Sequence, residues 1–339
     1  MSEDNNKEFV HLKIHTQYSI CEGALRTADL AKYCKENHIR AVGLCDSNNL
    51  CGALEFSETI AKSKTQPIIG TQLNVKYKEH IGKIPLFAKN LKGYKNLIKL
   101  SSKSFLEAEN DEDPNCKIKD IEENSNGLIL LSGSFDGLIG KLFYKNLTDE
   151  IFIILNKFKN ILKDNFYLEI QRHNDDGEKL FEKFLLNTSD KLSIPIIATH
   201  EVFYLDKDMH EAHDAYLCVG EKTYVNVKER RKYTNSHYLK NSKEMYELFH
   251  DLPDALENNA NFPYRISYRP KNSLPVLPNI QTSKNKDINE LLKKDSIEGL
   301  SEKLNTYVLS SLDEKNKIQV EKKYKDRLMH EIDIISKMK

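Results

Sequence analysis

Short apolar segments alternate with amphipathic helical segments along the first ~270 residues, and this alternation constrains the fold more than any other feature. It favours an α/β fold with a mainly parallel sheet, and about seven such units suit a closed barrel better than an open sheet. The periodicity alone does not show whether the sheet closes into a barrel. The predicted strands begin in the stretch 9–19 and continue at 41–45, 67–77, 84–88, 128–132, 166–171 and 195–199. Helices are predicted at 27–37, with Thr27 as N-cap, at 52–61 and at 93–102, and the segment 106–126 is predicted as a loop with short helical turns.

The stretch 9–19, FVHLKIHTQYS, begins as a strand and ends in polar residues. Successive side chains of a strand point to opposite faces, so His11, Lys13 and His15 are expected on one face. Three nitrogen-bearing side chains are unusual for a core face. They are typical of a barrel strand that ends in a polar pocket.

The charge balance excludes a general electrostatic attraction to nucleic acid or membranes. Charged residues make up 30% of the 339 residues, and their formal net charge is +0. Any basic surface must be local, as in VKERRKY at 227–233, which we expect to be a solvated helix or loop.

The six cysteines form no C-x-x-C pair and no zinc-finger spacing, and the polar start MSEDNNKEF is no signal peptide. No apolar run is long enough to span a bilayer. These features predict a soluble cytoplasmic protein with reduced thiols, no membrane partner and a disordered leader at 1–8.

The composition changes after residue 263. Residues 264–280 contain several prolines and no long period, so they are predicted to be an extended linker. Residues 281–339 are strongly charged and are predicted to be helical.

The motif FVHLKIHTQYSICEGA resembles FVHLHxHTxYSLLDGA, the opening motif of PHP (polymerase and histidinol phosphatase) domains. The segments NLCGALEF, PIIG, AKNLKGYKNL and EAHDAYLC resemble the polymerase branch of this family, the amino-terminal region of bacterial DNA polymerase III alpha subunits, more than the histidinol phosphatases. The resemblance implies a distorted (β/α)7 PHP barrel at 9–263, with its site at the carboxyl ends of the strands. It also implies that 281–339 are the helical start of the polymerase palm region, truncated before the catalytic aspartates.

The resemblance also implies a function and partners. The parent enzyme synthesises DNA on a DNA template with Mg²⁺ in its palm, and its PHP region serves as a scaffold and as a docking surface for the proofreading exonuclease subunit. The expected partners are therefore the rest of the alpha chain, that exonuclease and, through the parent enzyme, DNA. No catalytic residue is expected in this chain.

PHP sites hold divalent ions with His, Asp and Glu side chains, and the motifs here depart from that pattern. The resemblance keeps His15, Asp46 and His173, and it gives Glu201 for aspartate. The other matched positions read Lys13, Ser47, Lys83 and Phe203 for histidine, Gln72 for glutamate and Ser134 for cysteine.

The two lysines oppose a dication. A pair of unit charges about 4 Å apart interacts by roughly 4 kcal/mol at an effective dielectric of 20, and a dication doubles that. We therefore expect no bound metal and no cofactor. We expect the ammonium groups of Lys13 and Lys83 to replace the ions by pairing with Asp46 and Glu201, with the Lys13 nitrogen within about 4 Å of a carboxylate oxygen.

Two other functions remain open. One is a metal-dependent PHP phosphoesterase or 3′–5′ exonuclease, and the other is a free-standing interaction module. The pair His213 and Asp214 is expected to be structural, because its helix resembles the family helix that follows the last barrel strand. Surface positions are predicted for the histidines without a partner at ligand spacing, which are His210, His237, His250 and His330.

Overall fold

The computed structural model describes residues 8–108, 112–276 and 287–338, and the chain divides into two compact units, Met1–Asn272 and Ser273–Lys339. Each unit is described by itself. Residues 1–7 of the predicted leader (1–8), residues 277–280 of the predicted linker, and residues 281–286 and 339 of the predicted helical segment lie outside the described residues. No helix among the described residues is both long enough and apolar enough to cross a bilayer.

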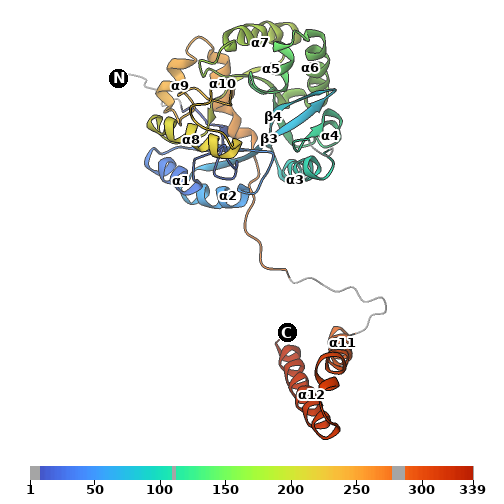
Figure 1. The fold of residues 1–339 in the computed structure, drawn as a ribbon. Helices are drawn as coiled ribbons and strands as arrows, with labels where there is room; N and C mark the ends of the chain where they lie inside the picture. The colour runs from blue at the N-terminus through green and yellow to red at the C-terminus, as the bar shows by residue number, and fades with distance from the viewer. Residues whose placement is uncertain (1–7, 109–111, 277–286, 339) are drawn as a thin grey trace. The chain divides into compact units, whose positions relative to one another are not determined.

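The first unit is built around one curled sheet (Figure 1). In the described part of the chain its strands are β1 (Lys13–Ile14), β2 (Ala41–Ser47), β3 (Gln66–Tyr77), β4 (His80–Ala88), β5 (Cys116–Lys117), β6 (Leu128–Leu131), β7 (Phe166–Ile170), β8 (Ile196–Ala198) and β9 (Glu201–Val202). Their order is β8-β7-β6-β4-β3-β2-β1-β9, and β5 pairs with β3. The predicted α/β class is confirmed.

The sheet is mainly parallel, as predicted, with β4 as its antiparallel strand. Strand β4 pairs antiparallel with both β3 and β6, whereas the other named pairs are parallel. Strands β3 and β4 form a hairpin in which Tyr77 faces His80, so the turn has only two residues. Lys78 in this turn has φ +53°, the left-handed backbone that tight hairpins require.

One continuous segment joins the two ends of the strand order. Strand β8 pairs with β7 through Ala198 and Ile170, and β9 pairs with β1 through Glu201 and Lys13. Strands β8 and β9 are separated by two residues alone, 199 and 200. The sheet therefore curls so that its two end strands are consecutive in the chain, and among the described residues no strand pairing closes the seam between β8 and the residues that precede β1.

Asn259 bridges this seam with its side-chain amide. Its Oδ1 accepts from the Val10 backbone N–H at 2.8 Å. Its Nδ2 donates to the carbonyl oxygens of Val10 at 2.8 Å and Ala198 at 3.0 Å. Asn259 is fully buried, so these backbone groups depend on the amide rather than on water.

Ten α-helices of the first unit surround the sheet in the described residues (Figure 1). They are α1 (Thr27–Glu36), α2 (Ala53–Lys62), α3 (Leu91–Leu106), α4 (Ile118–Glu123), α5 (Leu138–Tyr144), α6 (Thr148–Leu162), α7 (Glu178–Leu192), α8 (His210–Glu221), α9 (Ser242–Leu248) and α10 (Pro253–Asn261). Short 3₁₀ turns occur at η1 (Lys163–Asn165), η2 (Lys207–Met209) and η3 (Phe262–Arg265). The predicted loop at 106–126 contains β5 and α4.

The N-cap of helix α1 is not the predicted residue, Thr27. Its N-cap is Arg26, which makes no side-chain cap hydrogen bond, and Thr27 is the first helical residue. Thr27 is buried, so its side chain packs inward instead of capping the helix. The predicted apolar face, which includes Leu30 and Cys34, is buried as expected.

The amino end of the curled sheet is filled by an apolar cluster that includes Leu12, Phe87 and Ile129. Phe262, from the segment after α10, closes this end. Its ring lies edge-on to Phe87, with centroids 5.4 Å apart, and it is fully buried. The polar residues matched to the family site lie instead toward the opposite, carboxyl end of the strands.

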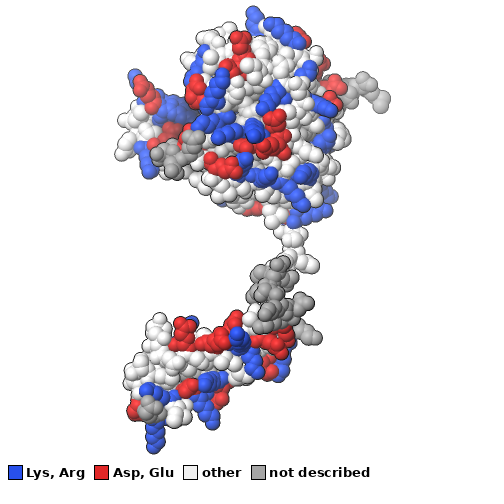
Figure 2. Space-filling model, turned by 90° about the vertical axis from the view of Figure 1, so that its right-hand side faces the viewer, with Lys and Arg blue, Asp and Glu red and all other residues white. Residues whose placement is uncertain are grey.

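The second unit is helical. It consists of α11 (Ile288–Lys303), a π-helical turn η4 (Leu304–Val308), a 3₁₀ turn η5 (Leu309–Ser311) and α12 (Glu314–Lys337). Helix α11 packs against α12. Figure 2 shows positive and negative side chains interspersed on the drawn face of each unit, in accord with the balanced composition.

Replacing Asn259 with leucine should destabilise the first unit by roughly 3 kcal/mol or more, because three buried backbone groups lose their partner at about 1–3 kcal/mol each. Urea unfolding measures the loss. Asn156→Leu is the matched control, since Asn156 is exposed and its amide bonds to Phe152 of its own helix. Equal stability of the two variants would contradict the role of Asn259 at the seam.

Candidate functional site

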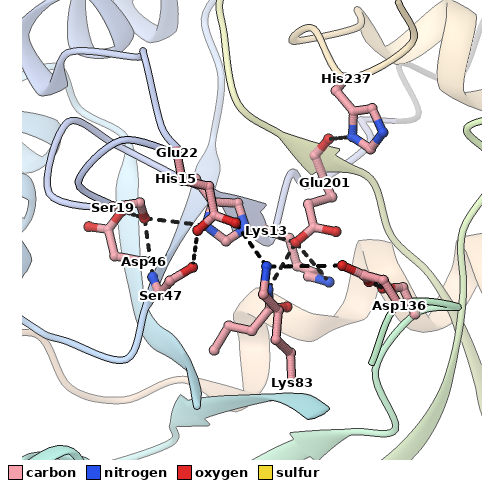
Figure 3. Close-up of polar contacts among 12 residues, drawn as sticks. Lys13, His15, Ser19, Glu22, Asp46, Ser47, Lys83, Asp136, Glu201 and His237 are labelled. Carbon is pink, nitrogen blue, oxygen red and sulfur yellow. Dashed lines mark hydrogen bonds and ion pairs between the residues drawn. The ribbon is translucent and has the colours of Figure 1, made fainter. Parts of the chain in front are cut away.

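Most of the predicted site residues converge at the carboxyl end of the sheet (Figure 3). Lys13 lies on β1, Asp46 on β2, Gln72 on β3, Lys83 on β4 and Glu201 on β9, while His15, Ser134 and His173 follow β1, β6 and β7. The residues on parallel strands come together because these strands end at the same edge of the sheet. Lys83 reaches this edge from the first half of β4, which runs antiparallel to them.

Glu201 is the common acceptor of the cluster. Its Oε1 lies 2.9 Å from His15 Nε2, accepts from Gln72 Nε2 at 3.0 Å and lies 3.5 Å from Lys13 Nζ. Burial alone would raise the pKa of this carboxyl, but the Lys13 ammonium and the His15 ring lower it well below its usual range. Glu201 therefore remains ionised.

Lys13 lies between two buried carboxylates. Its Nζ is 3.5 Å from Oε1 of Glu201 and 3.5 Å from Oε1 of Glu169, and its side chain is 0% exposed. Burial would lower the pKa of this ammonium, but the two carboxylates raise it above its usual value. The predicted pairing of Lys13 with Glu201 is confirmed, and Glu169 is a partner that the sequence analysis missed.

Glu169 could have been found from its position. It follows Phe166, Tyr167 and Leu168 in β7 and is a carboxylate in a strand that is otherwise apolar and buried. Its Oε1 accepts from two neighbours at the same edge of the sheet, Gln171 Nε2 at 2.9 Å and the Thr199 hydroxyl. Burial raises the pKa of Glu169, although Lys13 opposes that shift.

His11 does not share the face of Lys13 and His15, which corrects the prediction. Its Nε2 bonds to the carbonyl oxygen of Lys240 at 2.7 Å, and its ring lies edge-on to His200. Regular strand geometry begins only at Lys13, so the two-residue alternation does not extend back to His11.

Lys83 pairs with Glu22 rather than with Asp46 or Glu201, so its predicted partners are wrong. The Nζ of Lys83 lies 2.8 Å from Glu22 Oε1 and 4.0 Å from Asp136 Oδ2. Glu22 is buried, and its pKa, which burial would raise, is held well below its usual range mainly by the Lys83 charge. Sequence reasoning missed Glu22, although it lies near the end of the opening motif, in SICEG.

Asp46 is held by neutral donors instead of a lysine. Its Oδ1 accepts from the Thr16 N–H at 2.7 Å and from the Ser19 hydroxyl at 2.7 Å, and its Oδ2 accepts from the Thr16 hydroxyl at 2.8 Å. Burial raises the pKa of Asp46 despite these bonds. The polar end of the segment HTQYS thus satisfies the buried carboxyl locally.

A stack of three buried imidazoles lies beside Glu201. The ring of His173 lies 3.9 Å from that of His237, with 9° between the planes, and 4.4 Å from that of His200. His237 Nδ1 bonds to the Glu201 carbonyl oxygen at 3.1 Å, so its predicted surface position is wrong. Burial lowers the pKa of all three rings, to about 4 for His237, and keeps them neutral at pH 7.

The other histidines singled out in the sequence have structural roles or lie toward the surface. His213 Nε2 donates to the Glu22 carbonyl oxygen at 2.7 Å, as expected for a structural residue. His250 and His330 are exposed, as predicted, and His210 is half-buried.

The basic segment 227–233 is not simply solvated, which corrects the prediction. The guanidinium of Arg230 is almost fully buried and pairs with Asp214. Arg231 Nη1 reaches Glu22 Oε1 at 3.3 Å. Part of this positive charge is therefore used inside the chain, at the rim of the site.

A hollow of about 380 Å³ opens above these residues. Its lining includes five carboxylates, two imidazoles and two cations, which belong to Asp136, Asp175, Asp176, Glu178, Glu201, His173, His237, Arg231 and Lys232. Ser134 lines it too, and its hydroxyl donates to the Asp136 carboxylate. Across the described residues, no three His, Cys, Asp or Glu side chains are grouped as they would be around a metal ion.

Comparisons with known proteins agree with the motifs. Residues 11–173 match the family model described as PHP domain. DNA polymerase III subunit alpha of Rickettsia felis is 36% identical over 335 residues, which is 98% of this chain and 28% of that protein. The subunit of Caulobacter vibrioides is 34% identical over 100% of this chain and 30% of its own length. The chain therefore spans less than a third of these relatives.

Replacing Lys13 with methionine should destabilise the first unit by about 3–5 kcal/mol, because Glu169 and Glu201 would lose their shared buried cation. Denaturant unfolding of the chain measures this change. Adding Glu169→Gln to the Lys13→Met variant should recover part of the loss, since one of the two buried negative charges is then removed.

Lys83→Met is the matched control at the rim, where the lysine side chain is 21% exposed and its partner Glu22 keeps Arg231 Nη1 at 3.3 Å. It should cost clearly less than Lys13→Met. A Lys13→Met chain as stable as the original, or no recovery in the double variant, would show that the ammonium does not hold these strand ends together.

Proposed function

The chain carries a PHP domain at residues 11–173 and is homologous over nearly its whole length to the N-terminal region of DNA polymerase III alpha subunits, and we propose that it acts as the structural PHP region of such a subunit. Its role is to scaffold the polymerase and to bind the proofreading exonuclease. DNA-templated DNA synthesis, with Mg²⁺, belongs in this proposal to the parent chain.

The observation that carries the structural role is the position of Lys13. Its ammonium lies 3.5 Å from each of the carboxylates Glu169 and Glu201, at the carboxyl end of the sheet where PHP domains bind metal. A dication bound by the same carboxylates would be repelled by this fixed charge, by several kcal/mol at separations near 4 Å. The donor set therefore does not suit a divalent ion.

The other donors support the same proposal. Gln72 donates to Glu201 through its amide nitrogen, and Ser47 donates to Glu22 through its hydroxyl. His15 Nε2 faces the carboxylate of Glu201. Each of these side chains is therefore directed at a neighbouring side chain, and we propose that internal ion pairs replace the metal cluster of the family.

The purified chain should retain far less than one zinc or manganese ion after dialysis and should hydrolyse neither p-nitrophenyl phosphate nor single-stranded DNA. Elemental analysis and a hydrolysis assay with added Mn²⁺ test this. Lys13→His, which restores the histidine of the family motif, is the informative comparison for metal retention.

About one ion per chain of the unmodified protein, together with Mn²⁺-dependent hydrolysis, would overturn the structural role. That outcome would favour the alternative, a metal-dependent phosphoesterase or 3′–5′ exonuclease.

The proposed docking surface for the exonuclease is an exposed apolar patch at the end of α8. It consists of Ile20, Val219, Tyr224 and Val225, which are 82%, 72%, 76% and 54% exposed. The loop with Ile20 is held against α8, because the next residue, Cys21, donates its N–H to the Tyr216 hydroxyl at 3.0 Å. A patch of this kind on an otherwise charged surface is typical of a protein interface.

Val219→Glu together with Tyr224→Glu should weaken binding of the proofreading exonuclease from the same organism at least about tenfold, by placing charge in the apolar contact. Surface plasmon resonance or analytical gel filtration measures the affinity. Tyr144→Glu is the control, since Tyr144 is 78% exposed on α5. Unchanged binding by the double variant would place the docking surface elsewhere.

A further inference from the structure

A second hollow lies at the amino end of the strands, where β7 and β8 begin, away from the site described above. Its volume is about 540 Å³, and it is bordered by the last turn of α6, the turns that follow α6 and α7, α10 and Arg265. Small-molecule sites usually have volumes of about 300–1,000 Å³. The hollow is therefore large enough for a whole small ligand, and larger than a bare phosphate ion needs.

Two turns with positive φ shape the opening. Lys163 follows α6 with φ +52° and ψ −121°, and Ser193 follows α7 in the left-handed helical conformation, with φ +48° and ψ +52°. The chain is redirected at each of these residues, toward β7 and β8. Both turn residues border the hollow, so its rim is set by the backbone and does not depend on mobile side chains alone.

Three cations and one carboxylate face this hollow. Lys159, Lys163 and Arg265 line it together with Asp164. In the parts of the chain that the structure describes, none of the three cations forms an ion pair with a carboxylate. The hollow is therefore locally positive in a chain whose formal net charge is +0.

Neutral oxygens hold two of these cations in place without neutralising them. Lys159 Nζ donates to the carbonyl oxygen of Leu192 at 2.5 Å. Arg265 Nη1 donates to the Asp164 carbonyl oxygen at 2.8 Å and to the Tyr167 hydroxyl, and its Nη2 donates to the Asn165 side chain at 2.9 Å. Among the described residues this leaves the Nε–H and one Nη2–H of Arg265 for a ligand. The charges in the hollow are thus positioned but remain available.

We propose that this hollow binds a small phosphate ester of nucleotide size. The cations supply charge-assisted hydrogen bonds to phosphate oxygens, and Arg265 presents the planar donor group that suits them. Phe166, Ile194 and Pro195 provide an apolar wall for the organic part of the ligand. This inference is independent of the proposed scaffold role, since the hollow shares no lining residue with the hollow above Glu201.

The test is isothermal titration calorimetry of the 339-residue chain with dATP as the probe. Lys163→Asn removes one cation, and asparagine is among the non-glycine residues found most often at positive φ. Lys222→Asn is the control, since Lys222 is also exposed, also follows a helix and also has positive φ, +54°, with ψ +40° where Lys163 has −121°. We expect the Kd for dATP to rise about tenfold in Lys163→Asn and to stay within about twofold in Lys222→Asn, as for loss of one charged contact.

Two further ligands separate the parts of the proposal. Deoxyadenosine, which has no phosphate, and pyrophosphate, which has no organic part, should each bind at least about tenfold more weakly than dATP. Lys159→Gln, which keeps a donor for the Leu192 carbonyl, should weaken dATP binding in the same way as Lys163→Asn. The inference would be overturned if dATP did not bind at millimolar concentration, or if both asparagine variants weakened its binding equally. It would also be overturned if deoxyadenosine bound as tightly as dATP.

Discussion

The buried ammonium of Lys13 is the interaction on which the carboxyl end of the sheet depends. It contacts carboxylates from β7 and β9, and it lies itself on β1. These strands flank the seam where the curled sheet meets itself. A buried ion pair is weak evidence for net stability, yet removing one partner leaves an uncompensated charge in the interior. The seam is thus held at one end by Lys13 and at the other by the Asn259 amide.

Around this ammonium, each buried carboxylate of the site has its own set of partners. Glu201 receives a cation and two neutral or titratable donors, and Glu22 receives a lysine at the rim. Asp46 receives only hydroxyl and backbone donors among the described residues. The stacked rings of His173 and His237 fit beside Glu201 because burial keeps them neutral, so that they do not repel one another. Some buried atoms, among them Lys13 Nζ and Glu169 Oε2, make no hydrogen bond, so the ammonium and its two carboxylates are held by charge. This pairing supports the proposed structural role.

The two ends of the strands therefore differ in character. At the carboxyl end, the buried charges of the site have an opposite charge or a hydrogen-bond partner within the chain, which supports the proposed scaffold role. At the amino end, Lys159 and Arg265 are held by neutral oxygens around a hollow of about 540 Å³. Charges that are held in place but not neutralised are expected of a ligand site, and this contrast motivates the proposed phosphate site.

Much of the fold class and the character of the site could be predicted from short segments, because strand period and residue chemistry are local properties. The alternation of strands and helices predicted the α/β sheet, and the resemblance to the PHP motifs, with a lysine at position 13, predicted a cation beside Glu201. The choice of partners could not be predicted in this way. Lys83 pairs with Glu22. The amide that bridges the seam belongs to Asn259, which lies 249 residues after its partner Val10. These groups are brought together by the curl of the whole sheet, and the local periodicity of the sequence does not predict which distant residues the curl brings into contact.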